Sequence, residues 1–246
     1  MELDDRRKDA LEKSGRVWLR NAISDADLSL LDEAASVQAR PGQRLKPSNA
    51  LGHVLSTGSS LLTAIQTLDP RAKPVRVVAF NKSDDANWGI PWHQDRVIAV
   101  DRREDVDGYR NWTNKSEIWH CEPPQAILDD MLFVRVHLDD TDQQNGAMEI
   151  AVGSHADGIV PAAQAGDIAG RYPREFCEAK RGDVLVLKML TLHSSRPAQV
   201  QSGRRVLRVD FSPSHLPSPL SWAKIAGDKA KTPPAHVVQK SGPEIA

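Results

Sequence analysis

The spacing of hydrophobic residues along the chain changes from a helical period to a period of two near residue 75. Residues 24–34 and 58–68 each begin with polar, helix-capping residues and continue with leucines at helical spacing. Two amphipathic helices are predicted there. From Val75 the alternation places one set of side chains on the same face of an extended segment: Arg76, Val78, Phe80 and Lys82.

Strand-like runs recur after this point and are separated by polar turns that contain Gly and Pro. They cover residues 131–138, 146–152, 183–192 and 205–211. This order predicts a mainly β protein with flanking helices, built as a double-stranded β-helix of the jelly-roll, cupin-like type. We expect one domain over residues 1–246, with a helical part at 1–74, a β core at 75–215 and a C-terminal tail at 216–246.

Residues 102–118 lack a clear period and predict a long ordered loop. Three aromatic residues, Tyr109, Trp112 and Trp119, lie in or beside it, which argues against disorder. The loop is either a lid over an active site or a packed surface loop or dimer contact. His120 and Cys121, at its exit, are not expected to be metal ligands.

The candidate chemistry begins at Pro91-Trp92-His93-Gln94-Asp95. In an extended segment, side chains two residues apart point the same way, so His93 and Asp95 can bind one cation from the same side. His193 ends an apolar run and is the best candidate for a third ligand. Two histidines and one carboxylate form the facial triad of non-haem Fe(II) oxygenases.

Two choices remain open on the residues alone. A second His-x-Asp, His137-Leu138-Asp139, ends a strand-like run and leads into a turn, which favours a structural role. Arg204 follows His193 by eleven positions and could grip a carboxylate with its planar guanidinium. However, Arg204 and Arg205 lie on opposite faces of the same predicted strand, and alternation does not say which face is the inner one.

Five separated motifs resemble the phytanoyl-CoA dioxygenase family. They are Trp92-His93-Gln94-Asp95; Leu138-Asp139-Asp140 with Asn145-Gly146 and Gly153-Ser154-His155; Gly182-Asp183; His193-Ser194-Ser195; and Arg204. The resemblance covers about residues 75–215 and departs from the family at Ala151-Val152, where many members have a proline. It implies that His93, Asp95 and His193 are the iron ligands. It also implies that Arg204 anchors the cosubstrate 2-oxoglutarate and that Ser195 helps to hold the same carboxylate.

The resemblance further implies a 2-oxoglutarate-dependent dioxygenase, an oxidoreductase that uses Fe(II) and dioxygen and releases succinate and carbon dioxide. A hydroxylated small molecule is the expected product, and Lys82 is a further residue that could reach the cosubstrate or an acidic substrate. Two alternatives stay open: a non-catalytic, cupin-like protein that binds or senses 2-oxoglutarate or a metal, and an oxygenase acting on a residue of another protein. The family includes several substrate classes, so the resemblance implies the reaction and not the substrate.

Composition changes this picture little. The formal net charge is −1 and the pI is about 6.7, which gives no electrostatic footprint for nucleic acid or an anionic membrane. The two cysteines, Cys121 and Cys177, fit no zinc or redox spacing and are expected to be reduced thiols. Without an apolar run long enough to cross a bilayer or a signal-peptide core, the sequence predicts a cytoplasmic enzyme.

Overall fold

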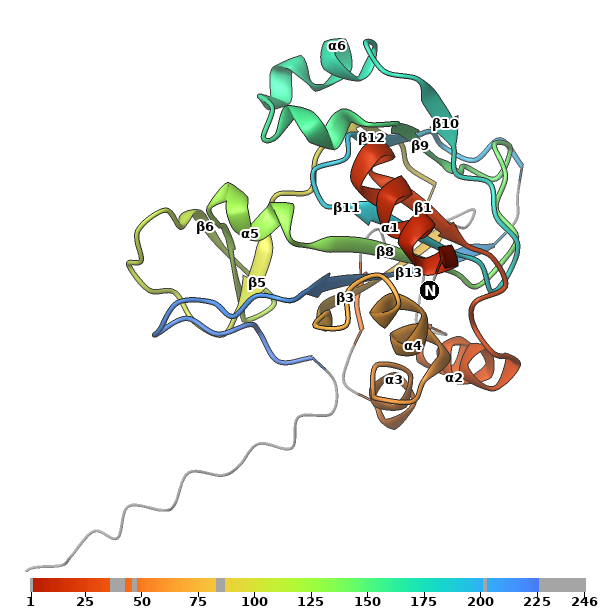
Figure 1. The fold of residues 1–246 in the computed structure, drawn as a ribbon, viewed down its shortest axis with the longest axis horizontal. Coiled ribbons are helices and arrows are strands. Elements are labelled where there is room, and N and C mark those ends of the chain that lie inside the picture. Colours follow the sequence, from red (N-terminus) through yellow and green to blue (C-terminus); the bar gives the residue numbers. More distant parts are fainter. Residues whose placement is uncertain (1, 36–42, 46–47, 83–86, 201–202, 226–246) are drawn as a thin grey trace, which may run out of the picture.

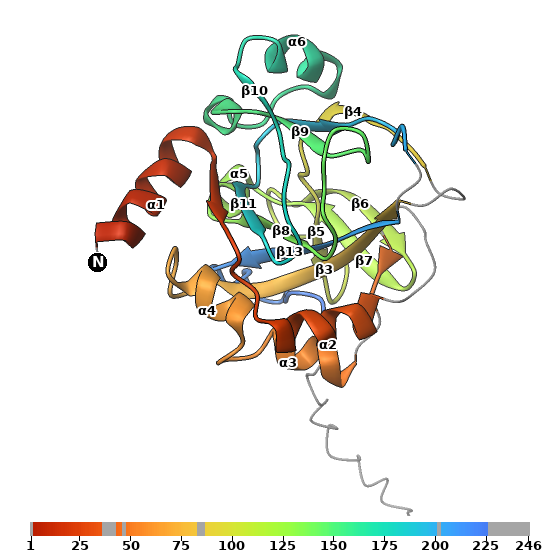
Figure 2. The same cartoon turned by 90° about the vertical axis from the view of Figure 1, so that its right-hand side faces the viewer.

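Two antiparallel sheets form the body of the protein in the computed structural model, which describes residues 2–35, 43–45, 48–82, 87–200 and 203–225. The larger sheet has the strand order β1-β11-β8-β13-β3-β2. Its strands are β1 (Arg16–Leu19), β2 (Gln43–Arg44), β3 (Lys73–Lys82), β8 (Leu132–His137), β11 (Val184–Lys188) and β13 (Arg204–Ser212). The smaller sheet lies above it in Figure 2 and has the order β10-β9-β12-β4. Its strands are β4 (Ile90–His93), β9 (Met148–Ala151), β10 (Arg174–Phe176) and β12 (His193–Ser195).

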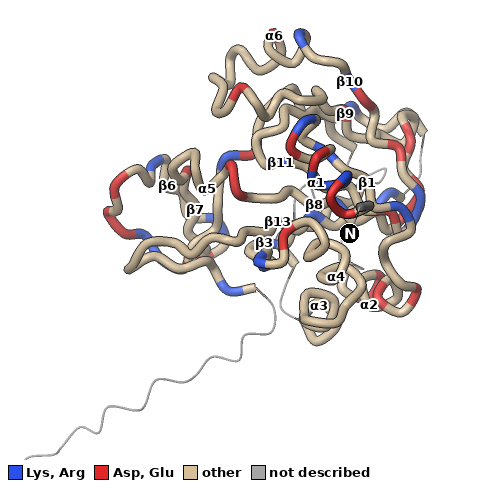
Figure 3. Tube along the Cα trace, viewed as in Figure 1, with Lys and Arg blue, Asp and Glu red and all other residues tan. Residues whose placement is uncertain are grey.

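The helices pack outside this pair of sheets (Figure 1). They are α1 (Glu2–Ser14), α2 (Asp25–Ala35), α3 (Asn49–Val54), α4 (Ser60–Gln66), α5 (Gln125–Asp129) and α6 (Ala165–Ala169), with 3-10 turns at Ser154–Asp157 and Ala162–Gln164. Acidic and basic residues are interspersed along α1 (Figure 3), in keeping with the formal net charge of −1. Among the described helices, none is both long enough and apolar enough to span a membrane.

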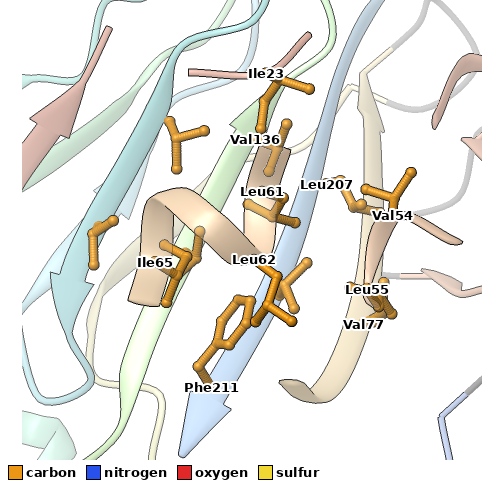
Figure 4. Packing of buried hydrophobic residues seen from close by; sticks show 14 of the residues in the cluster. Ile23, Val54, Leu55, Leu61, Leu62, Ile65, Val77, Val136, Leu207 and Phe211 are labelled. Atoms are coloured by element: carbon orange, nitrogen blue, oxygen red, sulfur yellow. The ribbon is translucent and has the colours of Figure 1, made fainter. Parts of the chain in front are cut away.

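Strand alternation gives the larger sheet two different faces. Its outer face packs on α2, α3 and α4, and Figure 4 shows Leu61, Leu62 and Ile65 of α4 against Val136 and Leu207 of the sheet. Helix α4 begins there because the Ser59 hydroxyl accepts a hydrogen bond from the Leu62 amide at 3.1 Å. Burying each such leucine contributes about 1.5–3 kcal/mol, so this layer fixes which side of the sheet faces inward.

The inner face of the larger sheet meets the smaller sheet. Phe133, Leu185 and Leu187 contribute to a second hydrophobic cluster that also contains Met148 and Ile150 of β9. At the β3 end of the same face the apolar side chains give way to arginines. The hydrophobic cluster therefore fills one side of the space between the sheets, and its residues Phe133 and Met148 also line a cavity of mixed polar and apolar character.

The predicted fold class is confirmed, and the predicted strands correspond to β3, β8, β9, β11 and β13. Helices α2 and α4 also match their predictions. The segment 1–74 differs from the expectation because it contains β1, which extends the larger sheet by pairing with β11. Four residues of alternation are too few to identify a strand without its partner. Of the predicted tail 216–246, residues after 225 lie outside the described part.

The expectation of a long loop at 102–118 was wrong. Strand β6 (Arg110–Lys115) pairs with β7 (Ile118–Glu122), and β7 pairs with β5 (Ile98–Val100), giving a third, three-stranded sheet. The hairpin turn uses Ser116 and Glu117, both with positive φ (51° and 64°), where Asn and Gly are the usual residues. Strand β6 is also mostly exposed, so neither its turn nor its hydrophobic pattern marks it in the sequence.

Candidate active site

A cavity of about 180 Å3 lies between the inner faces of the two main sheets. The larger sheet contributes the inward side chains of β3, β8 and β13, and the smaller sheet contributes residues of β4, β9 and β12. His93, Asp95 and His193 line this cavity together with Arg204, so the strand pairing brings together residues that are far apart in the sequence.

His93 and His193 face each other as a cross-strand pair between β4 and β12, with ring centroids 4.3 Å apart. The Nδ1 atom of His93 lies 2.9 Å from the carbonyl oxygen of Pro91, and that of His193 lies 2.9 Å from the carbonyl of Thr191. A carbonyl can only accept, so each Nδ1 carries the proton and each Nε2 keeps its lone pair for a metal. Burial and the neighbouring His193 both lower the pKa of His93, which favours the neutral, metal-binding form.

Asp95 completes the cluster. Its Oδ2 atom is 3.2 Å from Nε2 of His193, and one possible ligand atom from each of His93, Asp95 and His193 lies within 4.8 Å of the other two. Burial would raise the pKa of Asp95, but the charge of Arg208 and the two histidines lower it well below its usual range. The donor set is therefore two neutral imidazoles and one carboxylate, which suits Fe(II).

Arg208 of β13 holds the Asp95 carboxylate and was not predicted as a site residue. Its guanidinium donates to Asp95 and, at 2.6 and 3.0 Å, to both carboxylate oxygens of Asp210. Arg208 and Asp210 are 3% and 0% exposed, so this is a buried ion pair on the wall of the cavity. The pairing joins residues 113 positions apart, which no local sequence signal reveals.

Two motif residues that are not metal ligands, Gln94 and Ser154, form hydrogen bonds to the backbone near the cluster. Gln94 points away from the cluster and donates to the carbonyls of Gly158 (2.8 Å) and Leu190 (2.7 Å). Ser154, from the Gly-Ser-His motif, accepts a hydrogen bond from the Leu192 amide at 2.9 Å, directly before His193. Both side chains hold in place the backbone segments next to His93 and His193.

Arg204 and Arg205 take opposite faces of β13. Arg204 points into the cavity, is 3% exposed, and keeps its Nε and Nη1 atoms buried without a hydrogen-bond partner among the described residues. Arg205 points outward and binds Asp139 through Nε (2.9 Å) and Nη2 (2.8 Å), with Asp32 at 2.9 Å from its Nη1. The arginine at the predicted eleven-residue spacing is thus the one that faces the metal-ligand cluster across the cavity.

Of the two other predicted cosubstrate residues, Ser195 lines the cavity and Lys82 does not. Ser195 lines the cavity two residues after His193, and Lys82 is the register partner of Arg204 on the neighbouring strand β3. The Lys82 ammonium donates to the carbonyl of Arg196 and is 3% exposed. Burial, Arg204 and Arg135 lower its pKa to about 8.

The second His-x-Asp is structural. His137 is 1% exposed, its Nδ1 lies 3.3 Å from the Asp183 carbonyl, and burial lowers its pKa to about 3. Asp139 is bound to Arg205 on the outer side of the sheet. Neither residue belongs to the metal-ligand cluster found among the described residues.

The aromatic residues of segment 102–118 do not reach this cavity either. Tyr109 is buried in the second hydrophobic cluster, and Trp112 and Trp119 pack against it. His120 has its Nδ1 atom 3.0 Å from the Ile118 carbonyl. Of the two readings of this segment, the contacts favour packing over a lid, because its residues line the hydrophobic core and not the cavity.

A family model described as phytanoyl-CoA dioxygenase (PhyH) matches residues 7–206. The chain belongs to the phytanoyl-CoA dioxygenase family. The matched segment contains the metal-ligand cluster, Arg204 and the strands of both main sheets up to the start of β13, so the family assignment and most of the cavity rest on the same part of the chain. The resemblance drawn from the motifs is confirmed.

Solved structures with the same fold have low sequence identity to this family member. AviO1 from Streptomyces viridochromogenes Tue57 is 16% identical, with a TM-score of 0.61 over 88% of this chain and 98% of that one. The epimerase SnoN in complex with Fe3+, alpha ketoglutarate and nogalamycin RO is 15% identical, with a TM-score of 0.63 over 92% and 97%. HygX from Streptomyces hygroscopicus with nickel and 2-oxoglutarate bound is 14% identical, with a TM-score of 0.56 over 85% and 87%. No curated protein sequence gives a significant match.

Proposed function

We propose that this protein is an Fe(II)- and 2-oxoglutarate-dependent dioxygenase that hydroxylates a small molecule and releases succinate and carbon dioxide. Membership of the phytanoyl-CoA dioxygenase family supports the reaction class. One observation carries the proposal for this chain: a two-histidine, one-carboxylate cluster and a buried, unpaired Arg204 line the same small cavity. A metal and a dicarboxylate that bridges to an arginine satisfy both features at once.

His93, Asp95 and His193 are proposed to hold the iron through Nε2, a carboxylate oxygen and Nε2. Iron bound with 2-oxoglutarate and dioxygen supplies the oxidation, and the protein supplies position and shielding. A metal held by these three residues would keep further coordination positions for the cosubstrate. The Phe133 ring, with its centroid 5.2 Å from that of His193, keeps one side of the cluster apolar and excludes water.

Arg204 is proposed to bind the distal carboxylate of 2-oxoglutarate. A buried guanidinium with unsatisfied donors is costly, and a carboxylate satisfies two of them in a planar, bidentate arrangement. The Ser195 hydroxyl is proposed to donate to the same carboxylate, since Ser195 lines the cavity on β12 two positions after an iron ligand. Lys82 adds positive charge beside Arg204, which lowers the free energy of the bound anion.

We further propose that the enzyme acts in the cytoplasm. Cys121 and Cys177 are both free and buried, and burial raises the pKa of each thiol to about 12. Unreactive, unpaired thiols suit a reducing compartment. A small-molecule substrate fits the enclosed cavity better than a residue of another protein, which would need an open groove.

The decisive experiment is a substrate screen with the purified protein, Fe(II) and 2-oxoglutarate, reading oxygen uptake and succinate. Substrate-dependent succinate formation is expected, with a product that gains one oxygen atom from labelled dioxygen. The His93→Ala variant should be inactive in the same assay. Tight binding of 2-oxoglutarate without succinate for any compound would instead support a sensing protein.

A second experiment separates the two arginines. Arg204→Ala should raise the 2-oxoglutarate requirement by about two to four orders of magnitude, because removing one member of a buried charge pair costs about 3–5 kcal/mol. Arg205→Ala, on the outer face, should leave the requirement unchanged. The reverse result would reject the assignment of Arg204.

A further inference from the structure

A second unpaired arginine lines the cavity. Arg135 of β8 is 6% exposed, and its Nε atom is buried without a hydrogen-bond partner. The side chain comes from the inner face of a strand whose alternate residues, Val134 and Val136, pack on the helices outside. Nothing in the described part of the chain forms an ion pair with it. Its charge is therefore not explained by the fold.

The guanidinium of Arg135 reaches across the floor of the cavity. Its central carbon lies 5.8 Å from the centroid of the Phe80 ring on β3, although β13 lies between β8 and β3. In the sheet register Arg135 is opposite Arg208. Phe80 is opposite Val206, which lies on β13 midway between Arg208 and Arg204. The side chain thus runs diagonally from beside Arg208, which holds Asp95, toward Arg204.

The cavity arginines divide into two groups by their partners. Arg208 is paired with Asp95 and Asp210, and Arg76 has its Nη1 atom 3.7 Å from Asp210. Arg135 and Arg204 have no carboxylate partner at hydrogen-bonding distance in the described structure. Burial lowers the pKa of both, and Arg135 lowers the pKa of Arg204 further. The charges of the two unpaired guanidinium groups therefore repel each other.

We propose that Arg135 is a second anchor for the distal carboxylate of 2-oxoglutarate, which it binds together with Arg204. This inference rests on the proposed function. Arg135 and Arg204 line the same cavity as the metal-ligand cluster, and the Arg135 side chain is directed from the position of Arg208 toward that of Arg204. An anionic primary substrate bound by Arg135 is the competing assignment, which the test below excludes or supports.

The test compares Arg135→Met with Arg205→Met, a matched loss of one arginine from the outer face. Binding is measured by calorimetric titration of the anaerobic Fe(II) proteins with 2-oxoglutarate and with 2-oxopentanoate, which has a methyl group in place of the distal carboxylate. Arg135→Met should weaken 2-oxoglutarate by about 10- to 150-fold, the range for a hydrogen bond to a charged group. It should weaken 2-oxopentanoate by less than about threefold, and Arg205→Met should leave both unchanged.

The melting temperature of the protein without cosubstrate gives a readout that is independent of binding. Removing one of two unpaired buried charges should leave the melting temperature of Arg135→Met equal to the wild-type value or above it. Arg205→Met should melt at a lower temperature, because it loses its contacts with Asp139 and Asp32. If Arg135→Met folds poorly, Arg135→Lys replaces it, and this variant should keep the charge but lose several-fold in 2-oxoglutarate affinity.

Two results would overturn the assignment. Unchanged 2-oxoglutarate affinity in Arg135→Met would show that Arg135 does not bind 2-oxoglutarate and would assign it to the anionic primary substrate. Equal losses for 2-oxoglutarate and 2-oxopentanoate would place it away from the distal carboxylate. In either case the wild type still binds 2-oxoglutarate and the proposed function stands. A wild-type Fe(II) protein that binds no 2-oxoglutarate would reject both proposals.

Discussion

His93-Gln94-Asp95 and His137-Leu138-Asp139 share one sequence pattern, and each sends its aspartate to an arginine of strand β13. Asp95 meets Arg208 on the inner face beside the cavity, where the arginine side chain is 4% exposed and the aspartate side chain 24%. Asp139 meets Arg205 on the outer face, where both side chains are 27% exposed. The difference lies in which face of one strand supplies the arginine. The same short motif therefore contributes to the metal-ligand cluster in one place and to a surface ion pair in the other. Strand alternation decides which, because it sets the face on which the arginine lies.

The largest expected difference between the two segments is in metal binding. His93→Ala removes an Nε2 that faces the cavity and should reduce Fe(II) binding to background and abolish turnover. His137→Ala should retain one metal ion per chain, because its ring is buried outside the cluster. Metal content after reconstitution and dialysis checks this. Loss of metal in His137→Ala with retention in His93→Ala would exchange the roles of the two motifs.

The two aspartate–arginine pairs should differ strongly in their contribution to folding. Arg208→Met leaves the fully buried Asp210 without its bidentate partner and should lower the free energy of unfolding by about 3–5 kcal/mol. Arg205→Met removes a partly exposed partner and should cost about 1 kcal/mol or less. Urea denaturation measures both. The double variant Arg208→Met/Asp210→Asn should recover part of the loss, and equal stability of the two single variants would contradict the assigned burial.

The buried histidine of the second motif should make folding sensitive to acid. The folded protein keeps His137 neutral down to about pH 3, whereas a histidine in an unfolded chain protonates near about pH 6.5. The unfolded state therefore binds more protons between these values, and stability falls as the pH drops below about 6.5, by about 1.4 kcal/mol per pH unit.

His137→Leu should remove this contribution. Between pH 6.5 and pH 5 the wild type should lose about 2 kcal/mol more stability than the variant, measured by urea denaturation at each pH. The pKa of His93 is also lowered, but His93 is present in both proteins and cancels in the difference. Parallel stability curves for the two proteins would show that His137 is not the group responsible.

The smallest expected effect is at the outer aspartate. Asp139→Asn loses the charge that binds Arg205 but keeps an oxygen for the Arg205 amide, and Asp32 still contacts the guanidinium. The expected loss of stability is about 0.5–1 kcal/mol, with no change in metal affinity. Asp95→Asn, the matched change in the first motif, should weaken Fe(II) binding sharply. Similar metal titrations for the two variants would remove the distinction between them.

Sequence patterns predicted the three residues that the structure brings together as a possible metal-binding cluster, because the constraint on the first two is local. His93 and Asp95 stand two residues apart on an extended segment, and alternation correctly placed Arg76, Val78 and Phe80 on the face that lines the cavity. Alternation could not decide whether Arg204 or Arg205 points into the cavity. The inner face of β13 is defined only once α4 packs on the opposite face of the sheet.

The residues that were missed depend on contacts between distant segments. Arg208 binds Asp95 across 113 positions, and β1 is a strand only because β11 lies beside it. Arg135 did carry a signal: it is the one charged residue inside the strand-like run 131–138. A charge at an inward position of such a strand has to meet either a buried partner or a ligand.

The carbonyl groups of Pro91 and Thr191 orient both imidazole rings before any ion arrives, so the two nitrogen ligands are already turned toward the position of a metal. Such a ready-made nitrogen and oxygen site ranks divalent ions by their intrinsic affinities, which rise from manganese through iron, cobalt and nickel to copper. Geometry therefore gives iron no advantage over its competitors. Nickel or copper present during purification should displace iron, and the fraction of active enzyme then reflects the metal supply of the cell that made it.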